Sequence, residues 1–404
     1  MLLVNWGLKA HMGAVGRYIF RTTFGAFMVV LVSVTMLMWM TQAMRNVDLL
    51  TSQGQTVLVF IGITGLIIPL LVLLIAPIAL MIAAAHVLSK LSTDSELIVM
   101  NAAGMAPRQV FTPLLAVGLI VSLMVAAIAF YVSPKSLREA RRWATEVRAE
   151  VVSSKIEPGQ FTSIEGGKLT VHVRERKPNG QLSGVMVDDQ RDPKERMTIL
   201  AELGTILTND RGVFLILETG TVQRQETGKR DPAIIRFREY AFDLSRLSPG
   251  APASITYSAP ERFLMELIAP APGDTFAIEQ ADALRAEFHN RITAVLYPVA
   301  FLVLTFAYLG APRTTRQGRA TSLITAILLS VALRSAGFYG VLSGARTPAL
   351  LVLPYVALLL AFALGAWGIG RGQVIEPPAI IVRFLDALSE GASRLFARPR
   401  VQAP

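Results

Sequence analysis

The sequence contains no cysteine and only four histidines, which excludes several kinds of site. Without cysteine the chain can form no disulfide, thiolate nucleophile or cysteine-ligated metal site. The histidines form no ligand-spaced cluster, since they stand at His11, His86, His172 and His289. The nearest match to a phosphate-binding loop, Gly166-Gly167-Lys168, has Thr162 where the pattern requires glycine. No Ser-His-Asp or Cys-His arrangement is evident, so we expect no catalytic residues and no metal.

Acidic residues are also missing where the sequence is most apolar. No Asp or Glu stands in the middle of a long apolar run, although ion-coupled carriers usually place ionisable groups there. Hydrophobic residues make up 52% of the 404 residues. The net charge of +10 reflects an excess of Lys and Arg, and many of these basic residues flank the apolar runs. This distribution indicates a membrane-embedded protein rather than a nucleic-acid-binding one.

Six apolar stretches are each long enough to cross a bilayer as a helix, which takes about 20 residues. Pro69 and Pro77 should kink the second stretch. Lys and Arg cluster before the first stretch, between the second and third, between the fourth and fifth, and after the sixth, which predicts an inner-membrane protein with both termini cytoplasmic. The stretches cover residues 18–42, 56–88, 109–133, 292–311, 320–342 and 349–370.

The segment between the third and fourth stretches, residues 134–285, should be periplasmic, and it alternates as β-strands do. Turns are expected at Pro178-Asn179-Gly180 and at residues 209–212. The predicted fold is a membrane α-helical protein, with six transmembrane helices arranged three plus three and an inserted periplasmic all-β jelly-roll-like domain. Strands are expected around residues 169–173, 183–188, 197–201, 204–208, 213–218 and 233–243.

Four parts are expected along the chain. Transmembrane helices 1–3 should occupy residues 1–135, the β domain 136–275, transmembrane helices 4–6 residues 276–373, and a basic amphipathic cytoplasmic tail 374–404. Within the β domain, the charged stretch 136–150 should continue the third span as a helix. Residues 246–275 should form a linker to a helix over 276–291.

A short cytoplasmic helix is predicted within residues 90–106. Ser92 or Thr93 could cap its start, and Gly104 should end it. Such a helix between two spans could dock its apolar face into a groove of a cytosolic protein. Periodicity alone favours an ordinary interfacial loop helix instead. The residues expected on the apolar face are Leu97, Met100 and Gly104.

Residues 90–104, with the sequence KLSTDSELIVMNAAG, resemble the coupling-helix motif of the lipopolysaccharide-export permeases LptF and LptG. A second stretch, LRAEFHNRI at 284–292 followed by RQGR at 316–319, is more similar to the LptF branch. The three-plus-three layout with a central β domain also matches, so the resemblance covers nearly the whole chain. The two motifs together are fairly specific, whereas either alone would be moderately so.

The resemblance implies a permease subunit rather than an enzyme. It would pair with the paralogous permease LptG and with a dimer of the ATPase LptB. LptB would use the ATP and magnesium, so this chain would bind no cofactor. Lipopolysaccharide would leave the inner membrane and pass through the β domain to LptC and a periplasmic bridge, for outer-membrane assembly. Glu96 would be the polar coupling residue, with Leu97, Met100 and Gly104 around it.

Two sets of residues are candidate contacts for the lipid. The head group could meet Arg45, Arg291 and Arg334, although Arg334 could instead snorkel to the outer interface. The end of the first span offers only Gln42 and Arg45, fewer basic groups than the family leads one to expect. The acyl chains could lie in a groove of alternating apolar residues, for which a filled sandwich core is the alternative. These are Val171, Val173, Val185, Val187, Ile199, Ile206, Phe214 and Ile216.

The need to keep acyl chains out of water supports such a route. At about 0.8 kcal/mol per CH₂, exposing the roughly 60 methylenes of lipid A to water would cost about 50 kcal/mol. The lipid must therefore move from bilayer to apolar cavity to apolar groove without exposure. Two other functions fit the same residues: a permease half for another lipid or lipoprotein, and a membrane scaffold without transport activity.

Overall fold

The computed structural model describes most of the chain, and its residues group into two compact units. The helical unit contains the described parts of Met1–Gln42, Ile67–Ser136 and Ala259–Pro404, and the second unit those of Ala43–Leu66 and Leu137–Ser258. Most of the predicted tail at 374–404 lies outside the described residues. The described residues are 13–45, 57–155, 158–164, 168–178, 180–192, 195–209, 212–226, 232–243, 257–311, 316–371, 375–379 and 382–383.

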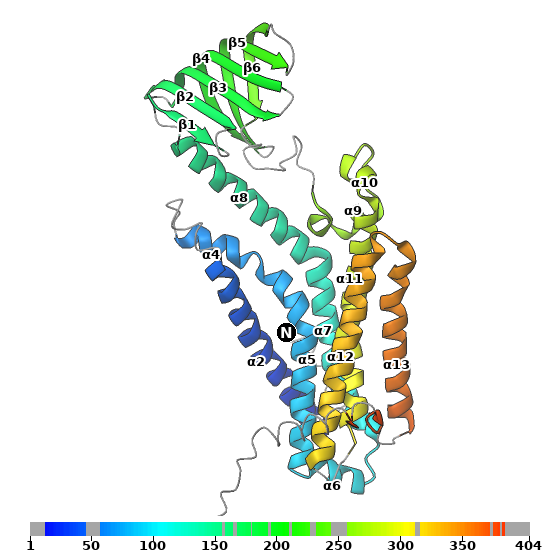
Figure 1. Cartoon of the computed structure of the whole chain (residues 1–404). Helices are drawn as coiled ribbons and strands as arrows, with labels where there is room; N and C mark the ends of the chain where they lie inside the picture. Colours follow the sequence, from blue (N-terminus) through cyan, green and yellow to red (C-terminus); the bar gives the residue numbers. More distant parts are fainter. Residues whose placement is uncertain are drawn as a thin grey trace, which may run out of the picture. The chain divides into compact units, whose positions relative to one another are not determined.

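Helices make up the first unit and part of the second (Figure 1). Within the described residues, 6 helical stretches are long and apolar enough to cross a membrane, which confirms the six-span prediction. These stretches are Ala14–Arg45, Phe60–Thr93, Pro107–Ala144, Ala281–Leu309, Ala320–Gly344 and Pro348–Gly370. In chain order the helices are α2 Ala14–Arg45, α4 Val57–Gly65, α5 Ile68–Thr93, α6 Glu96–Ala102, α7 Pro107–Ala127, the π-helix η2 Ile128–Val132, α8 Ser133–Lys155, the 3₁₀-helix η5 Ala259–Glu261, α9 Leu264–Ile268, α10 Thr275–Glu279, α11 Ala281–Leu309, α12 Arg316–Gly344, the 3₁₀-helix η6 Pro348–Val352 and α13 Leu353–Arg371.

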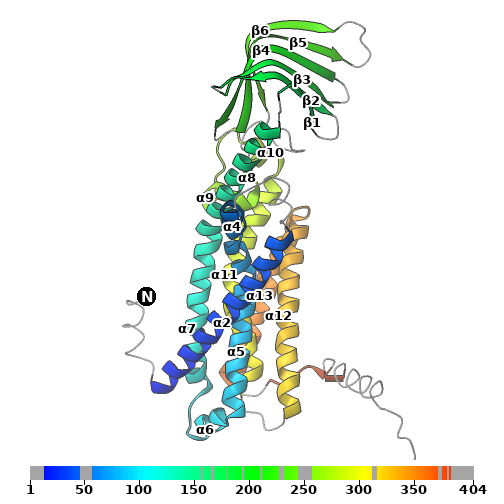
Figure 2. The same cartoon turned by 90° about the vertical axis from the view of Figure 1, so that its left-hand side faces the viewer.

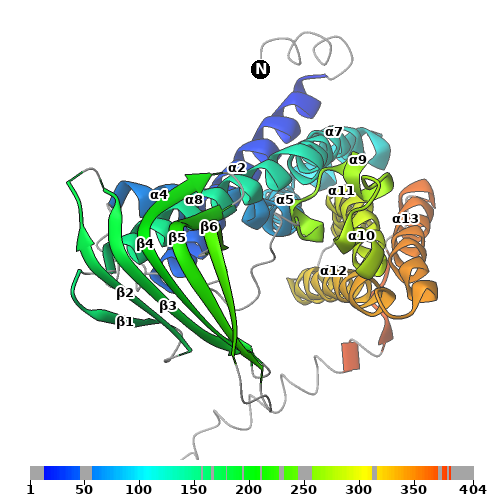
Figure 3. The same ribbon diagram turned by 90° about the horizontal axis from the view of Figure 1, so that it is seen from above.

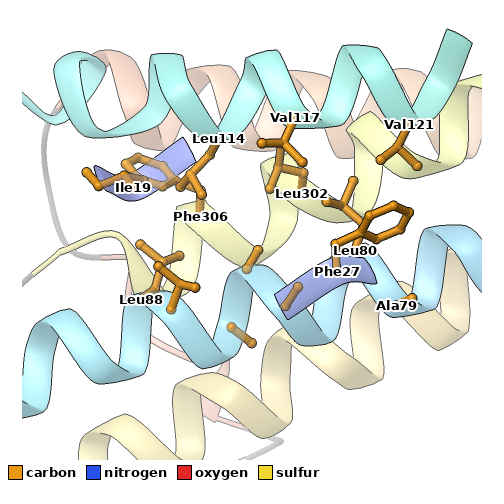
Figure 4. Close-up of a cluster of buried hydrophobic side chains, with 14 of the residues drawn as sticks. Ile19, Phe27, Ala79, Leu80, Leu88, Leu114, Val117, Val121, Leu302 and Phe306 are labelled. Atoms are coloured by element: carbon orange, nitrogen blue, oxygen red, sulfur yellow. The ribbon is translucent and has the colours of Figure 1, made fainter. Parts of the chain in front are cut away.

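Helix α11 forms the centre of the helical unit, and α5, α7, α12 and α13 pack around it (Figure 3). In its most apolar window 72% of the residues are buried, against 22–39% in the other five stretches. The outer helices therefore keep wide apolar surfaces, as expected of helices that face lipid. Figure 4 shows side chains of α2, α5, α7 and α11 meeting in the largest core cluster, among them Phe27, Leu80, Leu114 and Leu302.

The second apolar stretch is divided rather than continuous. Helix α4 ends at Gly65, and α5 begins at Ile68 with Pro69 in its first turn, where the missing N–H of proline leaves no hydrogen bond unmade. Pro77 stands inside α5. Within the second unit, α4 packs against α8 where the indole of Trp143 lies directly on Gly62, a position with no room for a Cβ. Helix α8 continues the third stretch through η2, as predicted for residues 136–150.

The β region is a single antiparallel sheet in which each strand pairs with its sequence neighbours, in the order β1-β2-β3-β4-β5-β6. Pro178 and Gly180 of the predicted turn lie between β2 and β3, and Gly180 has a φ of 84°, whereas Asn179 lies outside the described residues. The predicted strands at 197–201 and 204–208 are one strand, β4, and β1 was not predicted. The strands are β1 Phe161–Ile164, β2 Leu169–Arg176, β3 Leu182–Asp192, β4 Glu195–Asn209, β5 Gly212–Glu226 and β6 Ala233–Asp243.

A jelly roll places eight strands in two facing sheets, whereas these six described strands form one curved sheet (Figure 2). The predicted all-β insertion is therefore present, with the simpler topology of a meander. One curved sheet can bury its own apolar face: Leu169, Val171, Leu182 and Leu215 are all fully buried in one cluster.

The side-chain alternation of this sheet changes phase along one row of residues. On each side of this row every second residue of a strand faces inward, but the alternation shifts by one residue across the row. Ala201 and Gly204 of β4 are therefore both buried although they are three residues apart. The row includes Gly184 of β3, with a φ of 65°, and Thr219 of β5, with a φ of 51°. Such backbone conformations allow the local irregularity and the bending that goes with it.

Residues 259–280 belong with the helical unit, which differs from the expected domain boundary at residue 275 and from the expected linker. They contain η5, α9 and α10. Leu267 of α9 and Ala259 share a buried cluster with Leu284 of α11. This apolar contact draws the segment onto the first turns of α11, which begins at Ala281 rather than at 276.

Candidate functional site

The helix α6 is shorter than predicted, and residues with positive φ flank it at both ends. It follows Ser95, whose φ is 60°, and no side chain caps it. Ser92 and Thr93, the predicted caps, belong instead to the last turn of α5. Gly104 ends the helix as predicted, with a φ of 79°. The N–H of Met105 donates to the carbonyl oxygen five residues earlier at 3.0 Å, as in a Schellman motif.

The apolar residues of α6 divide between two faces. Leu97 is 3% exposed, and Met100 packs against the same core cluster, which includes Leu88 and Leu91 of α5. The predicted docking face is therefore wrong for Leu97 and Met100, because they anchor α6 to its own bundle. Glu96 is half-buried, and Gly104 is exposed.

The outward face of α6 carries two apolar residues that the sequence analysis did not single out. Val99 is 65% exposed and Ile98 is 41% exposed. A run of four consecutive apolar residues, Leu97 to Met100, was the available signal, since such a run must place side chains on both faces of a short helix. Anchored on one face and bare on the other, α6 is a rigid apolar projection at one end of the bundle (Figure 1).

Arg291 is not available to a lipid head group. It is 4% exposed and forms an ion pair with Glu287, with 2.7 Å between Nε and Oε1. Its Nη1 donates to the carbonyl oxygen of Arg262 at 2.7 Å, and its Nη2 to that of Pro260 at 2.9 Å and of Ala259 at 3.3 Å. The guanidinium therefore fastens the chain before α9 to α11.

Arg334 in α12 is half-buried and lies over the ring of Tyr297 of α11, 4.6 Å from its centroid. Gly337, one turn further along α12, leaves the space that the Tyr297 hydroxyl occupies. A cation–π contact offsets part of the cost of an arginine in an apolar helix. Arg45, the third candidate, is exposed in the last turn of α2. The structure thus gives the three arginines three different environments.

Six of the eight residues predicted to line an acyl-chain groove lie on the inner face of the sheet. Five of these, Val171, Val173, Val185, Val187 and Ile199, are at most 2% exposed and pack in the core of the sheet itself, and Ile206 packs against them.

Phe214 and Ile216 are on the other face. Leu215 and Leu217 of the same strand are the buried residues, because the phase of β5 is reversed on this side of Thr219. Phe214 lies opposite Leu207, which is 49% exposed. The prediction for these two residues was therefore wrong, and the inner face forms a filled core rather than an open groove.

The outer face of the sheet has one well-organised polar cluster. Arg196 donates from Nε and Nη2 to the two oxygens of Asp188, both at 2.9 Å, and Gln190 and Thr198 donate to the same carboxylate. The hydrogen bonds from Arg196 lower the pKa of Asp188, although burial opposes them. With every oxygen already bonded, this cluster stabilises the pairing of β3 and β4.

The model of the family described as lipopolysaccharide export system permease LptF/LptG matches residues 17–375, most of the chain. The chain belongs to the LptF/LptG family. It is 24% identical over 327 residues to the lipopolysaccharide export system permease protein LptF of Escherichia coli K12, covering 78% of this chain and 82% of that protein. It is also 24% identical over 325 residues to an uncharacterized protein of Rickettsia prowazekii, covering 78% of this chain and 88% of that protein.

As an LptF/LptG permease, this chain is a transporter subunit and not itself an enzyme. It is a multi-pass protein of the inner membrane that exports lipopolysaccharide together with other Lpt components. Family membership and the six apolar helices agree on this, and the separate antiparallel sheet completes the expected three-plus-three arrangement.

Proposed function

We propose that this chain is the LptF-type half of an ATP-driven complex. It would pair with LptG, and an LptB dimer would supply ATP hydrolysis with its own magnesium, so that this chain binds no nucleotide or metal. The similarity to LptF of Escherichia coli supports the LptF role. The observation that carries the proposal is α6, a helix fixed to the bundle by Leu97 that exposes Ile98 and Val99.

Helix α6 would transmit the movement of the ATPase to the spans. It stands directly between α5 and α7, and the buried Leu97 joins it to the core that both helices share. A push on Val99 would therefore be passed to two spans rather than absorbed by a loose loop. Glu96, at the first position of α6, remains the candidate polar contact with the partner.

The orientation follows from the basic residues. Lys90 and Arg108 flank α6, and Arg17 and Arg21 stand in the first turns of α2, at the ends that the positive-inside rule assigns to the cytoplasm. Both termini would then be cytoplasmic and the sheet periplasmic.

The sheet would deliver lipopolysaccharide to LptC. Within the described strands β6 pairs only with β5, so its other edge is free to accept a further strand. Ile234 and Ile235 of β6 are 61% and 53% exposed and offer apolar surface at this edge. Arg45 and Arg334 remain candidate contacts for the head group, and Arg334 would have to exchange the ring of Tyr297 for a phosphate.

A cross-linking experiment tests the role of α6. Because the chain has no cysteine, Val99→Cys provides a single thiol, and we expect it to cross-link to LptB in the assembled complex. Val99→Asp should leave the expression and folding of the complex intact, because Val99 is exposed. It should lower ATPase-dependent release of lipopolysaccharide, because a charge replaces the apolar side chain that would contact LptB. Asn101→Asp is the matched control, because it adds the same charge at an exposed position of α6 that lies about 160° around the helix from Val99. Efficient transport by Val99→Asp, without cross-linking from position 99, would refute the assignment.

A further inference from the structure

The turn between α9 and α10 carries an exposed apolar tip. Met265 and Ile268 of α9 are 73% and 59% exposed, and Ile278 of α10 is 75% exposed. The residues that follow α9, Ala269-Pro270-Ala271-Pro272-Gly273, are exposed and uncharged, and Asp274 then caps α10. Clustered exposed apolar residues of this kind usually mark a surface that something else covers.

Three charged residues next to this tip have partners within the segment, whereas Glu279, beside Ile278, is exposed. Arg262 is 5% exposed, and its guanidinium contacts both carboxylate oxygens of Asp274, with Nη1–Oδ2 at 2.5 Å and Nη2–Oδ1 at 3.1 Å. Glu266, the one acidic residue within the tip, accepts a hydrogen bond from the N–H of Phe263 at 2.8 Å. Covering the tip with an apolar medium would therefore leave none of these three charges without a partner.

The contacts of the tip with α11 lie at the membrane–water boundary and just outside it. Leu267 packs with Leu284, which precedes the apolar run at residue 292 by eight residues, or about 12 Å of helix. Phe288, in the same cluster, precedes it by four residues, or about 6 Å. The head-group layer extends roughly 5–7 Å beyond the hydrocarbon on each side, so Phe288 lies within this layer and Leu284 lies about 5 Å outside it.

An aromatic pair marks the same level. The ring of Phe263 lies 5.9 Å from that of Tyr131, and Tyr131 is 58% exposed. Lys135 lies over the Tyr131 ring at 5.7 Å. Tyrosine and lysine are typical of helix ends at a bilayer surface. Figure 1 shows α9 and α10 at the end of the helical unit opposite α6.

We propose that residues 265–273 and Ile278 form an interfacial anchor at the outer edge of the lipid head-group layer. Met265, Ile268 and Ile278 insert toward the acyl chains, and the Arg262–Asp274 and Arg291–Glu287 pairs keep the segment folded against α11. The occupant is the phospholipid surface, because the tip is fixed to α11, a membrane span whose apolar run begins only one to two turns beyond their contact. A stable protein interface uses about 20 residues a side, far more than these three exposed side chains supply. The anchor would fix the depth of α11, the central helix.

Fluorescence quenching tests this proposal on the full chain. Ile268→Cys and Ile278→Cys, each a single thiol, are labelled with an environment-sensitive fluorophore and reconstituted into vesicles of phosphatidylcholine and phosphatidylglycerol. We expect a blue-shifted emission, loss of fluorescence with doxyl-labelled lipid, and weak quenching by aqueous iodide. Thr219→Cys in β5 is the aqueous control, and Val331→Cys, 55% exposed on α12, is the lipid control.

Two results would overturn the proposal. Strong iodide quenching without lipid quenching, as at position 219, would place the tip in water. Protection from both quenchers would show that protein covers it. The substituted side chains are exposed, so these variants should fold, and circular dichroism of each labelled protein checks that they do.

Discussion

Replacing Arg291 with methionine should destabilise the protein without any direct effect on lipid binding. The side chain is 5% exposed, and its loss removes an ion pair with Glu287 and donors to three carbonyl oxygens. Removing one partner of a buried pair costs about 3–5 kcal/mol, because the other charge stays buried. The hydrogen bonds belong to the same network, so we expect about 3–5 kcal/mol in total rather than a sum over contacts.

Thermal unfolding in lipid–detergent micelles measures this effect, and α11 supplies its own control. Arg285 pairs with Asp282, but the two side chains are 48% and 59% exposed, so Arg285→Met should cost less than about 1 kcal/mol. Adding Glu287→Gln to Arg291→Met should recover part of the stability, because no buried charge then remains unpaired. Equal stability of the two single variants, with lipopolysaccharide binding lost only in Arg291→Met, would refute the structural role and restore the head-group interpretation.

Three further variants test the packing and the electrostatics. Gly337→Ala should destabilise the helical unit by about 1–3 kcal/mol, because the new Cβ would overlap the hydroxyl of Tyr297. Adding Tyr297→Phe should recover part of this loss in the same thermal melts. If it recovers nothing, the contact is contradicted. Thr219→Gly should stabilise the sheet by about 1 kcal/mol in denaturant unfolding, because a φ of 51° strains a β-branched residue. Thr221→Gly is the control and should destabilise the sheet. If Thr219→Gly destabilises the sheet and Thr221→Gly stabilises it, the strain at Thr219 is refuted. The ion pair of Asp188 lowers its folded-state pKa, so its stabilisation should be complete above its unfolded pKa of about 3.9 and lost as pH falls through the lower folded value. Asp188→Asn should remove this acid-dependent part, and an unchanged pH profile of unfolding would show that the pair contributes nothing.

The spans were predictable because a bilayer demands about 20 apolar residues, a signal that needs no tertiary information. The helix at residues 281–291 was also predicted, but not the burial of its first turns, because its charged side chains are typical of a solvated helix. Only the fold shows that Arg291 is surrounded by carbonyl groups from residues 29–32 positions earlier in the chain. A sequence shows that a charge is present, but it does not show which distant backbone atoms surround it.

The same limit explains the errors in the sheet and in α6. Strict alternation holds within β2, where Leu169, Val171 and Val173 all face inward. It fails across Thr219, because one residue with positive φ resets the phase and exchanges the faces of Phe214 and Leu215. In α6 the four apolar residues could have been buried on either side, and the packing of α6 on α5 decides the outcome.

The filled core of the sheet constrains how this permease could hand on its lipid. Exposing the roughly 60 methylenes of lipid A to water would cost about 50 kcal/mol of free energy, so the acyl chains must stay covered throughout transfer. Yet Val171, Val173 and Val187 are already fully buried against their own neighbours, and acyl chains could replace those contacts only by separating the strands. Apolar surface at the edge strands avoids this cost: Ile234 of β6 is 61% exposed. A groove completed by a partner strand at an edge would cover the chains while leaving the core of the sheet intact, and it is therefore the less costly of the two routes.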